Sequence, residues 1–119
     1  MKGYLESEFG EVTVEDEVIA QVAGHAALEC FGIVGMATTG VKDGIAKLLK
    51  GDSMTKGVHV RLQETNDLEI DFHIIVAYGV SIQAVCDNLI SAVKYSVEEM
   101  IGLNVKKIRI FVEGVRVID

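Results

Sequence analysis

The chain has 119 residues, a formal net charge of −7 and a composition that is 50% apolar, and it contains neither proline nor tryptophan. This length corresponds to one domain, which we expect to span residues 1–119. The hydrophobicity excludes an intrinsically disordered chain, and the absence of proline excludes a collagen-like or proline-rich linker protein. The N-terminus lacks the apolar segment of a secretory signal, and the longest uncharged run, Phe72–Cys86, is too short to span a bilayer. We therefore expect a cytoplasmic protein without a transmembrane segment.

Charge is distributed unevenly along the chain. Residues 1–17 carry six acidic side chains against one lysine, whereas residues 42–61 carry five basic side chains against two acidic ones. The N-terminal segment is therefore acidic and the middle is basic. Such asymmetry suits oriented association with another protein better than it suits catalysis.

The first half of the chain predicts alternating strands and helices. A strand is expected at Glu11–Glu15, where apolar and polar residues alternate, and a helix at Asp16–Cys30, where apolar residues recur every three or four positions. Gly32 is expected to end this helix. Ile33–Met36 is expected to be a short strand. Val41–Lys50 predicts a short amphipathic helix whose apolar side is formed by Ile45, Leu48 and Leu49.

Two runs with alternating apolar residues, 58–63 and 68–77, predict a β-hairpin turning through residues 65–67. A two-residue loop would place apolar side chains opposite charged ones, whereas a loop of odd length keeps each face uniform. We favour the register that pairs Glu64 with Leu68. This register also places Arg61 opposite Asp71, an attractive cross-strand pair.

The last third of the chain predicts a long helix and a final strand. Ser81 is the expected N-cap of a helix that reaches Ile101 and closes at Gly102. The final strand turns Ile108, Ile110 and Val112 inward, and the apolar phase shifts after Gly114, which indicates a bulge. The expected fold class is α/β: a two-layer sandwich with a mixed sheet, a central β-hairpin and two long helices on one face, in the order β-α-β-short α-β-β-α-β.

Histidines on the predicted hairpin are the first candidate site. The favoured register sets His59 opposite His73, with Asp71 one diagonal away, and such a group could hold a divalent metal. The polar solvent face of a one-sided sheet explains the same residues with no ligand. Since nothing obvious completes a coordination shell, we expect neither a metal nor a cofactor.

The sequence supports no enzyme. None of its serines lies in a Gly-x-Ser-x-Gly elbow, and no glycine pattern matches a phosphate-binding or dinucleotide-binding loop. Cys30 and Cys86 fall on apolar helix stripes, which favours buried thiols over nucleophiles. We therefore expect no catalytic residue.

A KH-like RNA-binding module is the alternative interpretation. The run Gly32-Ile33-Val34-Gly35 matches the Gly-x-x-Gly loop that clamps nucleotide backbones in KH modules. That loop usually carries basic residues because it binds phosphates, whereas this one carries Ile and Val in a chain with a net charge of −7. We therefore expect no nucleic acid as a partner.

One end of the outward sheet face is the candidate interaction surface. Ile75, Ala77 and Phe111 are expected to point outward there, where an open sheet should not leave them in water. Self-association or partner docking would cover them, and so would the 41–50 segment of the same chain. That segment, with its lysines around an apolar side, could contact an anionic membrane surface, although it more simply covers a sheet edge. The candidate interaction residues are Ile75, Ala77, Phe111, Ile45, Leu48 and Leu49.

A specific sequence pattern is formed by Tyr78–Ile82, Asn88 and Val93–Val105. It is accompanied by Gly10–Val14, Glu29, Gly32–Ile33, Lys56–Val58 and Val112–Val117. In these segments nearly the whole chain resembles the alkaline shock protein family, the Gls-type envelope stress response family of Gram-positive bacteria, and its length is similar to that of the short YloU-like members. The family usually has a proline before the glycine that ends the first helix, where this chain has Phe31.

The resemblance implies a non-enzymatic cytoplasmic protein of cell-envelope homeostasis, held near the membrane by protein partners. It also implies self-assembly, which occurs in some members of the family. The family has no catalytic residues to transfer to this chain. On this basis we expect a homo-oligomer that acts through protein interactions.

Overall fold

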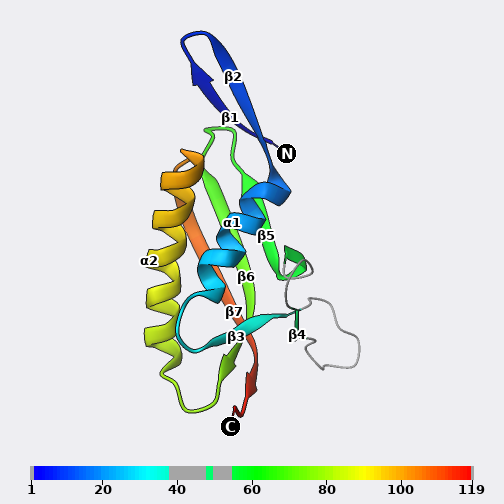
Figure 1. The fold of residues 1–119 in the computed structure, drawn as a ribbon, viewed down its shortest axis with the longest axis vertical. Coiled ribbons are helices and arrows are strands. Elements are labelled where there is room, and N and C mark those ends of the chain that lie inside the picture. The colour runs from blue at the N-terminus through cyan, green and yellow to red at the C-terminus, as the bar shows by residue number, and fades with distance from the viewer. Residues whose placement is uncertain (1, 38–47, 50–54, 119) are drawn as a thin grey trace.

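Two helices cover one face of a mixed sheet in the computed structural model of the chain (Figure 1). The structure describes residues 2–37, 48–49 and 55–118. The helices are α1 (Asp16–Leu28) and α2 (Ile82–Ile101), and they pack against each other as well as against the sheet. This arrangement confirms the predicted two-layer α/β sandwich.

The strand β6 (Leu68–Ala77) is the centre of the sheet. Its whole length pairs in parallel with β7 (Val105–Arg116) along one edge. Its other edge is shared by β5 (Val58–Leu62) and β3 (Ile33–Ala37), which pair antiparallel with its first and second halves. β4 (Leu48–Leu49) pairs with the outer edge of β3.

Alternation along β6 decides which face meets the helices. Five of its apolar residues are buried in the main core, and they are Leu68, Ile70, Phe72, Ile74 and Val76. α1 contributes mainly small residues to the same core, whereas α2 contributes a stripe of larger ones. Two other apolar side chains of α2 do not join this stripe, because Met100 points into solvent and Ile90 is partly exposed.

The β5–β6 hairpin keeps the predicted uniform faces but in a register shifted by two residues. Leu62 pairs with Leu68, whereas the sequence favoured Glu64 as the partner of Leu68. The loop still has three residues, because Gln63 N donates to Asp67 O at 2.9 Å. Such a loop needs a left-handed residue at its last position, and Asn66 takes it with φ 68°. Asparagine tolerates this conformation well, which explains why the loop is built on 64–66 rather than on 65–67.

The N-terminus forms a hairpin that the sequence analysis found only in part. β1 (Lys2–Ser7) pairs antiparallel with β2 (Gly10–Glu15), and the expected strand at Glu11–Glu15 is the second arm of this pair. The hairpin extends away from the two-layer body (Figure 1). Two of its side chains, Leu5 and Val14, are partly buried and pack against the core.

A glycine with positive φ follows the end of each helix. α1 ends at Leu28, two residues earlier than expected, and the chain then reverses at Gly32 with φ 91°. A Cβ at Gly32 would lie 2.6 Å from Val85 Cγ2, so a side chain at this position would force Val85 or the backbone to shift. Ser81 Oγ accepts a hydrogen bond from Ala84 N at 3.2 Å and caps α2, and Gly102 ends α2 with φ 85°, both as predicted.

The expected bulge in the last strand is present. The pairing of β7 with β6 shifts between Val112 and Gly114, so that Glu113 is the extra residue. Ile108 and Ile110 pack against the core as expected, whereas Val112 is exposed, contrary to the prediction.

The predicted short helix at Val41–Lys50 lies mostly outside the described residues. Leu48 and Leu49 belong to the structure as strand β4, so a helix is wrong at these two positions. A pairing partner in β3 explains the difference, because tertiary pairing overrides local helical periodicity in so short a segment.

Candidate interaction surfaces

The predicted interaction residues on the outer sheet face differ in their exposure. Ile75 is only 1% exposed and lies between two glycines, Gly35 of β3 and Gly114 of β7. Ala77 is half-buried, and Phe111 is 42% exposed. Ile45 lies outside the described residues, and Leu48 and Leu49 are placed only by the backbone of β4. Of this set, Phe111 is the described side chain that a partner can reach.

A charged network occupies the middle of the same outer face. Asp71 accepts two hydrogen bonds from Arg61, at 2.7 and 3.2 Å, and two from Arg109, at 2.9 and 3.0 Å. Burial alone would raise the pKa of the Asp71 carboxyl, but the hydrogen bonds and charges of the two arginines outweigh burial and lower this pKa to about 2. Glu69 accepts a further bond from Arg61 at 3.2 Å. Sequence analysis paired Arg61 with Asp71 directly, whereas the two are diagonal neighbours in the observed register.

Three rings form a row beside this network. His73 stacks on Phe111 with ring centroids 4.8 Å apart, and the edge of His59 meets His73 at 5.3 Å. Because the register is shifted, Asp71 rather than His73 is directly opposite His59. Among the described residues no group of three or more His, Cys, Asp or Glu is arranged to hold a metal ion. The row places two imidazole rings next to the exposed ring of Phe111 on the outer face.

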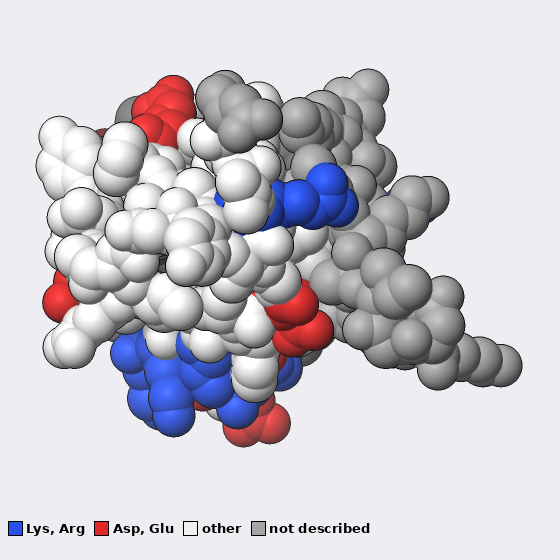
Figure 2. All heavy atoms as spheres, turned by 90° about the horizontal axis from the view of Figure 1, so that it is seen from below, with Lys and Arg blue, Asp and Glu red and all other residues white. Residues whose placement is uncertain are grey.

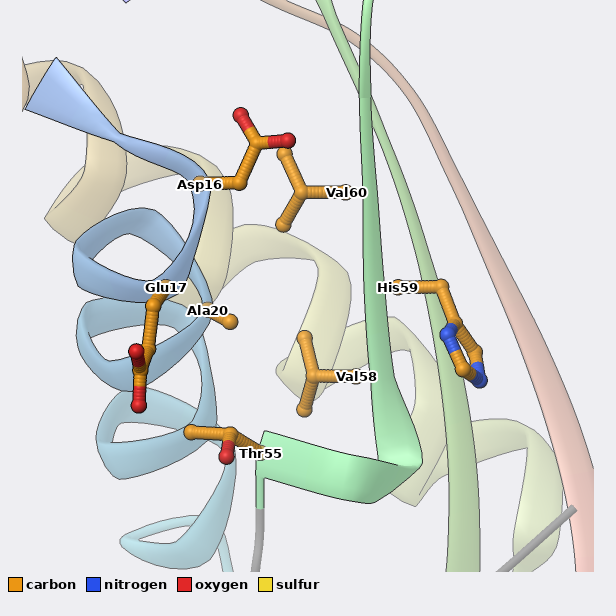
Figure 3. A pocket seen from close by; sticks show the side chains of 7 residues that line it. All are labelled: Asp16, Glu17, Ala20, Thr55, Val58, His59 and Val60. Carbon is orange, nitrogen blue, oxygen red and sulfur yellow. The ribbon is translucent and has the colours of Figure 1, made fainter. Parts of the chain in front are cut away.

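A hollow of about 260 Å³ lies between α1 and β5 (Figure 3). Val58 and Val60 point from β5 toward Ala20 of α1, and His59 lies on the opposite side of β5 (Figure 3). The polar residues among those that line this hollow are Asp16, Glu17, Thr55 and His59.

Neither cysteine has the environment of an active thiol. Cys30 and Cys86 are both partly buried, and the thiol of Cys30 lies 3.5 Å from the carbonyl oxygen of Ala26. Burial raises the pKa of both thiols, and the carboxylates of neighbouring Glu29 and Asp87 raise it further. A thiolate is therefore disfavoured at both positions.

The Gly-x-x-Gly run does not form a phosphate clamp. Gly32 is the turn after α1, but Ile33 already begins β3 and Gly35 is buried within that strand. A KH-type clamp needs an open loop whose backbone meets nucleotides. In this chain the second glycine of the run therefore belongs to the sheet and not to an open loop.

Sequence analysis missed an exposed aromatic surface at the end of the molecule where the C-terminus lies. Phe31 is 83% exposed and Tyr78 is 74% exposed, and both line a groove of about 450 Å³ at the start of α2. Seen from this end, a broad part of the face is uncharged, whereas Lys and Arg side chains lie along one edge and also reach across the face, with Asp and Glu side chains near them (Figure 2). Further exposed apolar residues of α2, of β7 and of the chain after β7 are Ile82, Val115, Val117 and Ile118. The groove is lined by Phe31, Tyr78, Gly79, Val80, Ser81, Ala84, Val85 and Asn88.

The sequence contains a pattern that could have predicted the exposure of Phe31 and Tyr78. Phe31 and Tyr78 each immediately precede a glycine with positive φ, Gly32 at 91° and Gly79 at 96°. Such a glycine reverses the chain sharply, which leaves the preceding side chain at the outside of the bend.

None of the helices in the described part of the chain is long and apolar enough to cross a membrane.

Comparisons of the sequence with known proteins identify its family. The model of the alkaline shock protein family, which is described as having a cell envelope-related function, matches residues 4–117. The chain is 46% identical over 114 residues to the uncharacterized protein YloU of Bacillus subtilis, covering 95% of this chain and 94% of YloU. It is 32% identical to Spy1614 of Streptococcus pyogenes, covering 96% and 94%, and 31% identical to YqhY of Bacillus subtilis, covering 93% and 81%. No solved structure gives a significant match. The chain belongs to the alkaline shock protein family, whose function is related to the cell envelope and whose description names no catalytic activity.

Proposed function

We propose that this protein acts at the cell envelope as a non-enzymatic interaction protein, through self-association and through protein partners at the cytoplasmic side of the membrane. The observation that carries the proposal is the groove at the start of α2, where Phe31 and Tyr78 are exposed. Large apolar side chains gathered in water are typical of protein–protein contact surfaces. The envelope-related description of the family supports the cellular setting.

Self-association is tested by sedimentation velocity of the purified chain over a wide concentration range. We expect the average mass to rise above the 12.9 kDa of one chain as concentration increases. A single species of one-chain mass up to the highest concentrations would contradict self-association.

Attachment through a protein partner is tested separately. We expect the protein to sediment with membranes from cells that contain it, and not with protein-free vesicles of anionic phospholipid. Direct binding to such vesicles would contradict the partner and favour contact with the lipid surface itself.

A further inference from the structure

The tip of the N-terminal hairpin presents an aromatic residue to solvent. Phe9 is 93% exposed, and it stands in the two-residue turn between β1 and β2. Glu8 and Glu11 beside it are also exposed, so the aromatic ring is carried on an acidic arm. No contact within the described part of the chain explains a phenylalanine at this position.

The turn itself is an unusual place for Phe9. Two-residue hairpin loops favour the primed turns, which need positive φ and therefore glycine or asparagine. Asn66 is the one non-glycine residue with positive φ in the described part of the chain, so Glu8 and Phe9 both keep negative φ. The sequence thus departs from the residues that would best stabilise this turn. Such departures from local preference are expected at functional positions.

The groove at the other end offers a matching site. Its volume of about 450 Å³ falls within the range of pockets that bury small organic groups, which is ample for one aromatic ring. Its lining combines Phe31, Tyr78 and the apolar start of α2, and it includes no acidic residue.

The tip and the rim of the groove also carry opposite charges. Arg116 is exposed beside the groove, where its carbonyl oxygen accepts a hydrogen bond from Tyr78 N at 2.7 Å. Glu8 and Glu11 of the tip carry the opposite charge. Complementary charges at the rim of a contact fix its orientation and exclude like-charged partners.

The tip and the groove lie at opposite ends of the longest axis of the molecule (Figure 1). One chain therefore cannot place its own tip in its own groove. We propose that the tip around Phe9 of one copy binds the Phe31–Tyr78 groove of a second copy. This inference rests on the self-association proposed above and names its contact.

The contact is heterologous, because two different surfaces meet. Every copy then has both a free tip and a free groove, so that the assembly continues until it closes as a ring or extends as an open chain. A two-fold dimer, in which the same patch meets itself, is the geometry that this proposal excludes.

Complementation between two variants tests the proposal. Phe9→Ala removes the tip but keeps the groove, and the double variant Phe31→Ala, Tyr78→Ala removes the groove but keeps the tip. These side chains are exposed, so both variants should fold, which circular dichroism verifies. Each variant alone should associate at least about tenfold more weakly than the wild type. Mixed in equal amounts, they should form a 1:1 dimer that grows no further.

Tyr95→Ala is the matched control, because Tyr95 is an exposed aromatic residue of α2. It should leave self-association unchanged. If the wild type associates but the tip and groove variants associate equally well, the tip–groove contact is wrong while the proposed function stands. If the wild type remains monomeric, both fail. If Phe9→Ala weakens only the binding to vesicles or to another protein, the occupant of the groove is not a second copy and the inference is overturned.

Discussion

Replacing Asp71 by asparagine tests the charged network on the outer sheet face. Asp71 is a buried carboxylate that accepts four hydrogen bonds from two guanidinium groups, and Asp71→Asn leaves both arginines without its charge. Hydrogen bonds to charged groups contribute about 1.5–3 kcal/mol each. Since Arg61 and Arg109 are 40% and 44% exposed, solvent partly replaces what they lose. We expect the free energy of unfolding at pH 7 to fall by about 2–3 kcal/mol.

The pH dependence provides an independent magnitude. The pKa of Asp71 is lowered from its ordinary 3.8 to about 2 in the folded protein. At about 1.36 kcal/mol per pH unit, this difference corresponds to about 2 kcal/mol of stability. Because the folded pKa is the lower one, this contribution is complete above pH 4 and is lost as the pH falls from about 4 to about 2.

The measurement is urea unfolding of the wild type and of Asp71→Asn from pH 7 to pH 2. We expect the difference between their free energies of unfolding to shrink below pH 4. Glu69→Gln is the matched control, because Glu69 is on the same strand and face but bonds only Arg61 and Gln63. It should cost less than about 1 kcal/mol at pH 7. A difference between wild type and Asp71→Asn that stays constant down to pH 2 would refute the electrostatic origin of the loss.

Four further substitutions test the fold in urea unfolding. Gly32→Ala should lower the free energy of unfolding by about 3 kcal/mol or more, because φ at Gly32 is positive and the new Cβ would meet Val85. Gly79→Ala should lower it by only about 1–2 kcal/mol, because φ at Gly79 is also positive but no other atom lies near the new Cβ. Equal losses for these two glycine variants would contradict the steric argument. Ser81→Ala removes the N-cap of α2 and should cost about 1 kcal/mol, with no change expected if the cap were unimportant. Phe72→Ala should cost about 3–5 kcal/mol, because Phe72 is fully buried in the centre of the core.

The core could be predicted from the sequence because burial leaves a periodic pattern. Alternation along 68–77 placed every second residue of β6 inward, and the three-to-four spacing found both helices. The caps at Ser81 and Gly102 were predictable, because a hydroxyl acceptor and a left-handed glycine satisfy helix ends locally. Each of these features depends on residues close together in the chain.

Features that depend on distant or specific geometry were missed. The hairpin register is set by the left-handed conformation of Asn66, and alternation alone permits any shift by two residues. The strand β1 was missed because its pairing with β2 is what makes it a strand. β4 contains only Leu48 and Leu49, too few residues for any periodicity.

The candidate surfaces were the least predictable part, for a related reason. A core residue is constrained by neighbours in its own chain, whereas Phe9, Phe31 and Tyr78 are between 74% and 93% exposed. Replacing such residues by alanine removes almost no contact within the chain, so the free energy of unfolding should stay within about 0.5 kcal/mol of the wild type. Stability and assembly therefore separate at these three positions. If their replacement destabilises the monomer instead, their role is internal to the fold and the reason for placing a partner there disappears.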